Sequence, residues 1–315
     1  MRLDLVAFKY IQFKRSMGMA INESERILKH FCQALGGVDI SEVNVSQVLA
    51  FLGSSGSTAA ASSYYKYGVL HTFYRFAVGR GHAQASPLPD KKPKKPDSSK
   101  PYIYSDEELK KLLDLTAAIE SPWRPITART LRALLILIYG AGLRMGEAVR
   151  LKVCDVDLKD RMITIRESKF YKTRLLPIGR KLSGALSKYH KRKSRRLKFL
   201  NEESTFFITR KGTAISKRQL QRAFKALLVK AKICRLDSGR YGPRLHDLRH
   251  SFAVHRLISW YRQGKDVQRL LPLLSTYLGH LSIEETKVYL SMTPELLSQA
   301  NKRFEKYALS EECHE

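Results

Sequence analysis

Residues 86–101 constrain the fold most strongly, because this stretch cannot contribute much to a hydrophobic core. Its sequence, SPLPDKKPKKPDSSKP, holds five prolines and five lysines among almost no apolar side chains. Proline stiffens such a segment and charge repulsion extends it, which is typical of a linker between domains. We therefore predict one domain at residues 1–85, a basic linker at residues 86–101, a second domain at residues 102–309 and a tail at residues 310–315.

Charge indicates the class of partner. The 315 residues include 57 lysines and arginines against 29 aspartates and glutamates, a formal charge of +28. This excess favours a polyanion, with nucleic acid ahead of an acidic membrane surface. No apolar run is long enough to cross a bilayer, and the N-terminus MRLDLVAFKY lacks the apolar core of a signal peptide. We expect a cytosolic protein without a membrane partner.

The first part is predicted to be helical, because apolar residues recur in it at helical spacing. Four segments show this pattern, at residues 4–18, 27–35, 45–53 and 63–81. In the last of them, Lys66 and Arg75 are candidate contacts with a DNA backbone, whereas most of the aromatic side chains are expected in the core. Lys94 and Lys95 of the linker are further candidates, although a solvated charge run is the commoner alternative.

The second part begins as helix and becomes mixed. Ser105 and Glu108 have the spacing of a capping box, which marks a helix start after the linker. The segments RMITIRE and TRLLPIG flank SKFYK in the pattern of a β-hairpin, with Lys169 and Lys172 at its tip, and TFFIT is predicted to be a further short strand. The fold class is therefore mainly α with a small antiparallel β-sheet.

Two stretches of the second part gather residues that suit phosphate chemistry. In AGLRMGE, Arg144 follows a glycine-loosened helix break, and Glu147 is placed to orient its guanidinium. In HDLRHSFA, His246 and Arg249 share one helix face, and Ser282 with Glu285 marks a helix that carries Tyr289. A phenol is a poor nucleophile near neutral pH, so a catalytic tyrosine needs such neighbours. For each residue alone, a structural role is the ordinary alternative. Tyr277 and Tyr307 are nearby alternatives to Tyr289, and the spacing from His280 decides for Tyr289.

Metal chemistry is not expected. The four cysteines are scattered and form no CxxC pair, which argues against zinc fingers and disulfide frameworks. HDLRH places His246 and His250 four residues apart, as in the zincin motif HExxH. The glutamate that would act as base is absent here, and Arg249 would repel a cation.

Five features follow one another along the chain: AGLRMGE, the lysine of SKFYKTR, HDLRHSFA, LGH, and a tyrosine nine residues after the histidine of LGH. In this order they resemble the tyrosine recombinase family, the phage-type integrases. The block before LGH is longer than in Xer-like members and is similar to transposon-encoded recombinases. The resemblance implies a DNA clamp, formed by a helical core-binding domain and a mixed α/β catalytic domain.

The resemblance also implies roles for individual residues. Tyr289 would attack a DNA phosphodiester to leave a 3′-phosphotyrosine and a free 5′-hydroxyl, and His246 would help to take its proton. Lys169, with Lys172 as the open alternative, would protonate the leaving oxygen. Arg144, Arg249 and His280 match the family's three contacts with the phosphate. Glu147 and His250 match two supporting residues.

The implied function is site-specific DNA recombination for integration, excision or transposition of a mobile element, in the bacterial cytosol or nucleoid. No cofactor and no metal are needed. The partner would be double-stranded DNA, on which monomers assemble into a tetramer at two sites. Other recombinases of the same element are candidate partners. A C-terminal helix would pack on a neighbouring protomer through Leu296, Leu297, Phe304 and Leu309, or fold back on its own chain. The alternatives are a type IB topoisomerase-like enzyme and a non-cleaving accessory subunit.

Overall fold

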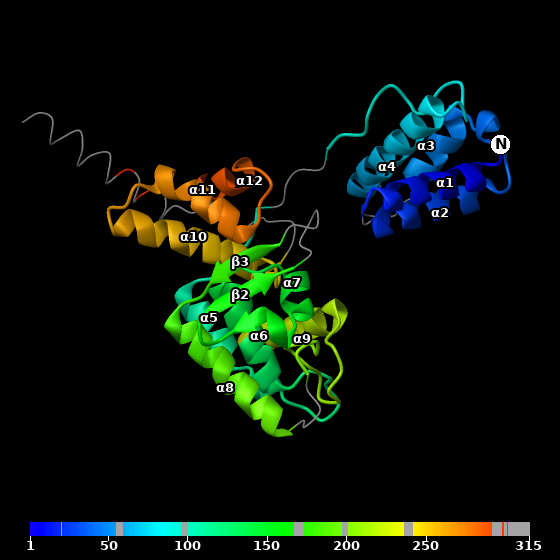
Figure 1. Cartoon of the computed structure of the whole chain (residues 1–315). Coiled ribbons are helices and arrows are strands. Elements are labelled where there is room, and N and C mark those ends of the chain that lie inside the picture. Colours follow the sequence, from blue (N-terminus) through cyan, green and yellow to red (C-terminus); the bar gives the residue numbers. More distant parts are fainter. Residues whose placement is uncertain are drawn as a thin grey trace, which may run out of the picture. The chain divides into compact units, whose positions relative to one another are not determined.

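The computed structural model describes most of the chain. The described residues are 1–19, 21–54, 59–95, 100–166, 173–196, 201–235 and 242–291, together with Ser298 and Asn301. The chain divides into two compact units, Met1–Ser98 and Ser99–Glu315 (Figure 1). Both are predominantly helical, and no described helix is long and apolar enough to span a membrane.

The first unit is a helical bundle, as predicted. Its helices are α1 (Leu3–Ser16), α2 (Asn22–Leu35), α3 (Val45–Gly53) and α4 (Ala59–Gly79). Phe73 and Tyr74 of α4 are fully buried and pack against Tyr10 and Phe31 of the first two helices. The expectation that most aromatic side chains of α4 belong to the core is therefore confirmed for these two.

Part of the predicted linker lies against this first unit. Leu88 packs on the hydrophobic cluster of the bundle, and the Tyr67 hydroxyl donates to the Pro89 carbonyl at 3.2 Å. The Lys92 ammonium lies 4.9 Å from the ring centroid of Tyr64. The one apolar side chain of the basic stretch thus anchors its beginning, and the first compact unit extends beyond residue 85.

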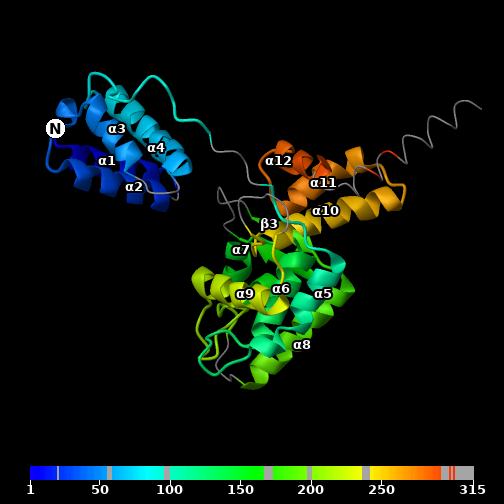
Figure 2. The ribbon, with the colours of Figure 1, turned by 180° about the vertical axis from the view of Figure 1, so that it is seen from behind.

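The second unit is built around α6 (Ala128–Gly140), which contacts helices on several sides (Figure 2). Leu134, Leu137 and Ile138 of α6 are fully or almost fully buried. The other helices of the unit are α5 (Asp106–Asp114), α7 (Met145–Arg150), α8 (Arg180–Arg196), α9 (Lys217–Ala231), α10 (Asp247–Arg262), α11 (Val267–Leu278) and α12 (Glu284–Lys287). The C-terminal half of α6 is apolar on most sides, which places it at the centre of its unit.

A three-stranded antiparallel sheet completes the unit, and its strands follow one another in the order β1 (Val156–Asp157), β2 (Met162–Ile165) and β3 (Arg174–Pro177). Ile163 pairs with Leu176, and both side chains are fully buried. The predicted hairpin and the predicted fold class, mainly α with a small antiparallel sheet, are both confirmed.

The predicted strand TFFIT is wrong. Its residues form only isolated bridges, Lys152 with Thr205 and Ile208 with Ala214. Phe206 and Phe207 are consecutive and both almost completely buried. A regular strand would send them to opposite faces of a sheet, so burying both in one core requires an irregular backbone.

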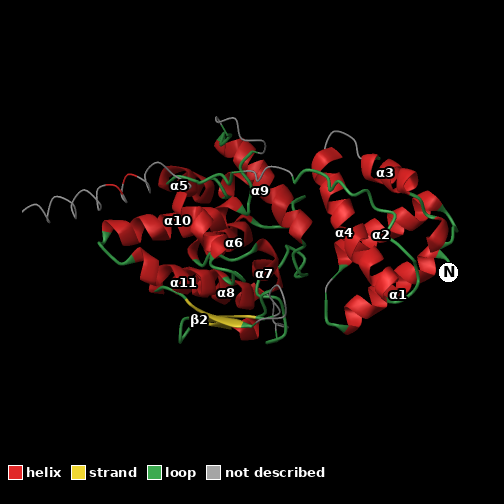
Figure 3. Cartoon of the chain, turned by 90° about the horizontal axis from the view of Figure 1, so that it is seen from above, coloured by secondary structure: helices red, strands yellow, loops and turns green. Residues whose placement is uncertain are grey.

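Helices α10 and α11 lie side by side (Figure 3) and form a second hydrophobic cluster within this unit. Phe252 and Leu257 of α10 pack there with Leu271 and Leu278 of α11. Tyr289 belongs to the same cluster and lies in a 3-10 turn, η5 (Val288–Ser291), which follows α12 directly. The predicted helix therefore begins close to the expected position, but it becomes a 3-10 turn at the tyrosine.

Candidate active site

The loop after α6 brings Arg144 to the ends of two other helices. Gly142 has a φ of 60°, and a Cβ atom there would lie 2.5 Å from Phe252 and 2.8 Å from Leu278. Glycine is therefore required both for the backbone conformation and for the close approach of α10 and α11. Arg144 then caps α7, with its backbone in the extended region.

Glu147 is the carboxylate at the centre of the site. Its two oxygens accept hydrogen bonds from the Arg144 backbone N–H and side chain, each at 3.0 Å. The same oxygens accept hydrogen bonds from Nη1 and Nη2 of Arg174, at 3.0 and 2.9 Å. Burial alone would raise the pKa of Glu147, but the hydrogen bond and charge of Arg174 and the contacts of Arg144 outweigh it, so the pKa lies below its usual value. The predicted pairing of Glu147 with Arg144 is present, and Arg174 is added to it.

Three consecutive carbonyls at the C-terminal end of α11 hold three arginines. Arg174 Nε donates to Tyr277 O at 3.1 Å, Arg249 Nη2 donates to Leu278 O at 2.7 Å, and Arg144 Nη2 donates to Gly279 O at 2.8 Å. The last carbonyls of a helix have no partner within the helix and form the negative end of its dipole. The end of α11 thus supplies the acceptors that fix an otherwise repulsive group of cations.

The glycine of the LGH motif, Gly279, is required by its backbone conformation and by its close contact with Arg174. Its φ is 70°, and a Cβ atom there would lie 2.8 Å from the Arg174 guanidinium. The His280 backbone N–H, one residue later, donates to Ser275 O at 3.0 Å. The left-handed turn therefore ends α11 and directs His280 towards the arginines.

Arg249 is the most enclosed of the arginines. Its side chain is 2% exposed, and Nη1 donates to Gly142 O at 2.8 Å. Burial and the neighbouring Arg144 charge lower its pKa to about 10, which still leaves it charged at neutral pH. Glu147 is hydrogen-bonded to Arg144 and Arg174, and one carboxylate against three guanidiniums leaves an excess of positive charge that suits an anion.

The phenol of Tyr289 faces this cluster from η5. Tyr289 is 3% exposed, and its hydroxyl lies 3.0 Å from His250 Nδ1. Burial raises the pKa of Tyr289 above its usual value, and the charges of Arg249 and then Arg144 offset only part of that rise. The neighbouring arginines therefore make the phenolate that a nucleophile requires less unfavourable than burial alone would.

The histidine beside the phenol is His250, whereas the resemblance assigned the proton to His246. His246, an exposed residue at the start of α10, has its ring centroid 4.8 Å from that of His250, and the two rings are perpendicular. Desolvation by the surrounding protein lowers the pKa of both, that of His250 to about 3, so both rings are neutral at neutral pH. A neutral imidazole has a lone pair that can accept a proton, but the lowered pKa values make both rings weaker bases than a free histidine.

His280 is held by a residue that sequence reasoning missed. Its Nδ1 atom lies 2.7 Å from Thr286 Oγ1, and its ring stacks with that of Tyr289 at a centroid distance of 6.1 Å. Burial, followed by the charges of Arg249 and Arg144, lowers the pKa of His280 to about 4. Thr286 stands three residues before Tyr289, and that helical spacing is the signal that could have identified it.

Arg174 was also missed. It is separated from Leu176 by one residue, and side chains two apart in a strand share a face. Leu176 is fully buried, so the arginine at the start of β3 points into the unit, where it meets Glu147. An arginine on the core face of a predicted strand was the available signal.

The other predicted site residues belong to the first unit or lie outside the described residues. The Lys66 ammonium donates to Phe51 O at 2.8 Å and to Ser54 Oγ at 3.0 Å, so it caps the end of α3. Three of the remaining candidates, Arg75, Lys94 and Lys95, are exposed. Lys169, Lys172 and the predicted C-terminal contacts Leu296, Leu297, Phe304 and Leu309 lie outside the described residues.

Two further observations limit where chemistry occurs among the described residues. No group of three His, Cys, Asp or Glu side chains in that part of the chain is arranged to hold a metal ion. The alternative nucleophile Tyr277 directs its hydroxyl to Pro177 O at 3.3 Å, towards the sheet. Burial raises the pKa of Tyr277 as well.

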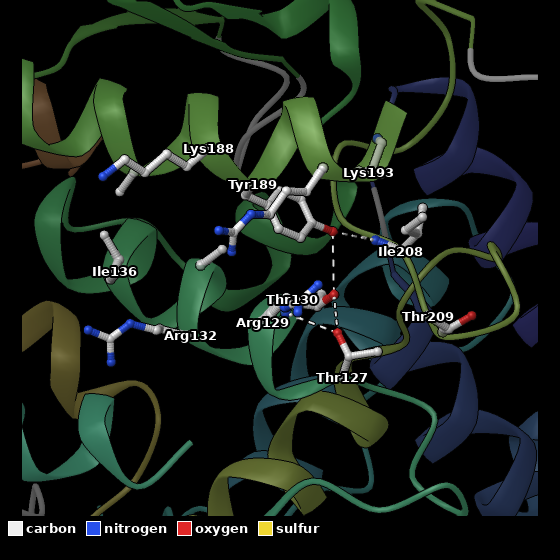
Figure 4. Close-up of a pocket in the computed structure, with 13 residues that line it drawn as sticks. Thr127, Arg129, Thr130, Arg132, Ile136, Lys188, Tyr189, Lys193, Ile208 and Thr209 are labelled. Carbon is white, nitrogen blue, oxygen red and sulfur yellow. Dashed lines mark hydrogen bonds between the residues drawn. The ribbon is translucent and has the colours of Figure 1, made fainter. Parts of the chain in front are cut away.

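A separate cavity of about 260 Å³ lies between α6 and α8 (Figure 4). Inside it, the Tyr189 hydroxyl lies 3.5 Å from Thr130 Oγ1 and accepts from Ile208 N–H at 3.4 Å. The described side chains lining it include neither a carboxylate nor an imidazole. The cavity is at the beginning of α6, whereas Arg144 follows its end, so it is distinct from the arginine cluster.

The chain is similar to known proteins over nearly its whole length. Residues 104–295 match the phage integrase family. The Sinorhizobium fredii protein y4rB, whose name describes an integrase/recombinase, is 33% identical over 302 residues, 95% of each chain. Tyrosine recombinase XerD of Bifidobacterium longum is 28% identical over 263 residues, 82% of this chain and 80% of that one. Among solved structures, a crystal structure of a lambda integrase dimer bound to a COC′ core site matches with a TM-score of 0.67 at 19% identity. The match covers 93% of this chain and 97% of that chain, so the two proteins share a fold.

Proposed function

Because this chain belongs to the phage integrase family and is a tyrosine-type site-specific recombinase, we propose that it cuts and rejoins DNA through a 3′-phosphotyrosine on Tyr289. The observation that carries the proposal is the position of one phenol against two histidines and a cluster of arginines. Tyr289 OH lies 3.0 Å from His250 Nδ1, and the charges of Arg249 and Arg144 favour its ionised form.

The proposed reaction uses these groups as follows. The Tyr289 oxygen attacks phosphorus, the phosphorus–O5′ bond breaks, and the phenol proton passes to the His250–His246 pair. Arg144 and Arg249 hold the non-bridging oxygens, whose negative charge grows in the transition state, and His280 donates to one of them. Lys169 delivers a proton to the departing 5′-oxygen, with Lys172 as the alternative donor.

Rejoining is the reverse of cleavage with a different 5′-hydroxyl. The phosphotyrosine retains the free energy of the broken phosphodiester, so no nucleotide cofactor is consumed. The arginines supply the charge neutralisation that metal ions give other nucleases.

The proposed partner is double-stranded DNA. The formal charge of +28 supports it, as does the lambda integrase dimer on a core site, whose fold this chain shares. Residues 1–85 would form the core-binding domain, residues 86–101 the linker and residues 102–309 the catalytic domain of a clamp. Monomers would assemble into a tetramer on two sites, in movement of a mobile element inside the bacterial cell, together with any partner recombinases of that element.

The proposed tetramer would depend on the C-terminal segment. Deleting the residues after Ser291 should abolish pairing of two DNA sites while binding to one site persists. An electrophoretic mobility assay separates the two species, and intact pairing would refute this assignment.

The test of the proposed chemistry is covalent trapping. Duplexes tiled across the DNA that flanks the protein's own gene, each nicked so that the cut fragment diffuses away, would be incubated with wild type and Tyr289→Phe. An SDS-resistant adduct is expected with wild type alone, and the released strand should carry a 5′-hydroxyl. DNA binding without an adduct in either protein would instead favour an accessory, non-cleaving role.

A further inference from the structure

We propose that Thr286 is a positioning residue that sets the tautomer of His280, so that Nδ1 accepts a hydrogen bond and Nε2–H is left to donate to the reacting phosphate. This inference rests on the proposed function for its consequence, but the tautomer itself is a property of the free protein. Thr286 acts only through His280, since no phosphate contact is assigned to it.

The geometry of the pair is fixed from both ends. Thr286 is fully buried, and its Oγ1 atom lies 2.7 Å from His280 Nδ1. The Thr286 backbone N–H donates to Ile283 O at 2.8 Å, which holds the threonine in the first turn of α12. On the other side, His280 is fixed through its own backbone N–H, which donates to Ser275 O at 3.0 Å.

The direction of the hydrogen bond follows from the needs of a buried hydroxyl. A neutral imidazole has one donor and one acceptor nitrogen, whereas a hydroxyl can both donate and accept. If Nδ1–H donated to Thr286, the threonine proton would need another acceptor, and no other hydrogen bond of Oγ1 is formed among the described residues. A buried donor without a partner is destabilising. The satisfied arrangement is therefore O–H donating to Nδ1, which requires the proton of the ring on Nε2.

The charges around His280 keep the ring in the neutral form in which a tautomer matters. Arg249, Arg144, Arg174 and the His246 ring all disfavour an imidazolium there, in addition to burial. A protonated ring would donate from both nitrogens whatever Thr286 did. A neutral ring donates to a phosphate oxygen only if its outward nitrogen carries the proton, so the threonine controls the contact.

The position of Thr286 also ties this contact to the nucleophile. Thr286 and Tyr289 lie on the continuous segment formed by α12 and η5. The packing that places the phenol beside the arginines therefore also places the tautomer-setting hydroxyl beside His280. Both parts of the site would be assembled, or lost, together.

The direct test is two-dimensional ¹⁵N NMR of the imidazoles in the full-length chain at pH 7.5, with His280 identified by its loss in His280→Asn. Wild type and Thr286→Ser should show the Nε2–H tautomer, and Thr286→Val should shift towards Nδ1–H. A Nδ1–H or doubly protonated ring in wild type would overturn the proposal, as would an unchanged His280 spectrum in Thr286→Val.

The second test measures single-turnover cleavage of the trapped substrate. Thr286→Val should slow adduct formation by about tenfold, a size typical of residues that orient a functional histidine, with DNA affinity unchanged. Thr286→Ser should restore the rate. The control is Thr276→Val, which makes the same chemical change on the exposed side of α11 and should cleave like wild type.

The two tests also separate this proposal from the proposed function. If wild type formed no adduct on any duplex, the proposed chemistry would fail while the NMR spectrum still decided the tautomer. If Thr286→Val and Thr276→Val cleaved equally fast, Thr286 would have no positioning role.

Discussion

At the scale of single residues, the site depends on one carboxylate shared between two arginines. Glu147 is 5% exposed, and its oxygens accept from the Arg144 backbone N–H and from both guanidiniums. Removing its charge leaves Arg144 and Arg174 close together without a counterion. Breaking a buried ion pair in this way is far more destabilising than losing an exposed one.

Glu147→Gln is therefore expected to lower the free energy of unfolding of the second unit by about 3 kcal/mol. Both tryptophans, Trp123 and Trp260, lie in this unit, so urea unfolding followed by tryptophan fluorescence reports on it selectively. Glu203→Gln, which removes the exposed pair with Lys152, should leave the transition close to that of wild type. Equal transitions for the two variants would show that Glu147 does not hold the arginines.

The partly buried histidines His250 and His280 predict a pH dependence of stability. Burial and neighbouring cations lower the pKa of His250 to about 3 and that of His280 to about 4, below the ordinary value of 6.5. Between about pH 4 and pH 6.5 the unfolded chain therefore binds more protons than the folded one, so stability falls as the pH decreases through this range. The urea midpoint of the second unit should be lower at pH 5.5 than at pH 7.5. A midpoint that stays constant or rises at pH 5.5 would contradict the lowered pKa values of these two partly buried rings.

At the scale of elements, the C-terminal end of α11 organises the cluster, and Gly279 makes its turn possible. Gly279→Ala should destabilise the second unit by more than about 1 kcal/mol, because the new Cβ atom combines a strained φ with a collision against Arg174. It should also slow cleavage, since Arg174 would have to move away from Glu147.

Gly264 provides a matched control for that substitution. Its φ is 66°, close to the 70° of Gly279, but a Cβ atom there would meet nothing within 4 Å. Gly264→Ala therefore carries the backbone strain alone and should cleave DNA at the wild-type rate. If the two alanine variants lost the same stability and activity, the approach of Arg174 to Gly279 would have no role.

The sequence predicted those parts of the site that local spacing determines. Arg144 and Glu147 lie three residues apart, and their hydrogen bond was expected. Arg174 and Thr286 were missed, because their importance comes from contacts with Glu147 and His280 that only the folded chain brings together. The sequence placed His246 beside the phenol, whereas His250 lies there, for the same reason. The packing of η5 against α10 decides which ring contacts Tyr289.

For the fold, periodicity predicted the helices of the first unit and the β2–β3 hairpin, whose burial repeats every 3.6 or every two residues. It failed at TFFIT, where β-favouring residues occur in an irregular segment. The side chains of the consecutive residues Phe206 and Phe207 both enter the same hydrophobic core, which a regular strand would not allow. Tertiary packing overrides a local strand preference in such a case.

At the scale of the whole molecule, the formal charge of +28 predicts strong salt dependence of DNA binding. If the protein neutralises about six to ten phosphates, its affinity should fall by about 10³- to 10⁵-fold between 50 and 200 mM salt. Replacing Lys94 and Lys95 by glutamine should weaken binding and reduce the slope of affinity against salt, as measured by fluorescence anisotropy. An unchanged slope would show that these linker lysines do not contact the backbone.

The measurement that tests the proposed chemistry most directly is mass spectrometry of the covalent adduct after digestion with nuclease and trypsin. Trypsin separates the two candidate tyrosines, because Tyr289 lies in the peptide of residues 288–302 and Tyr277 in that of residues 270–287. We expect the nucleotide mass on the peptide of residues 288–302, localised to Tyr289 by fragmentation. Finding it on Tyr277, or on any other residue, would contradict the assignment of Tyr289 as the nucleophile.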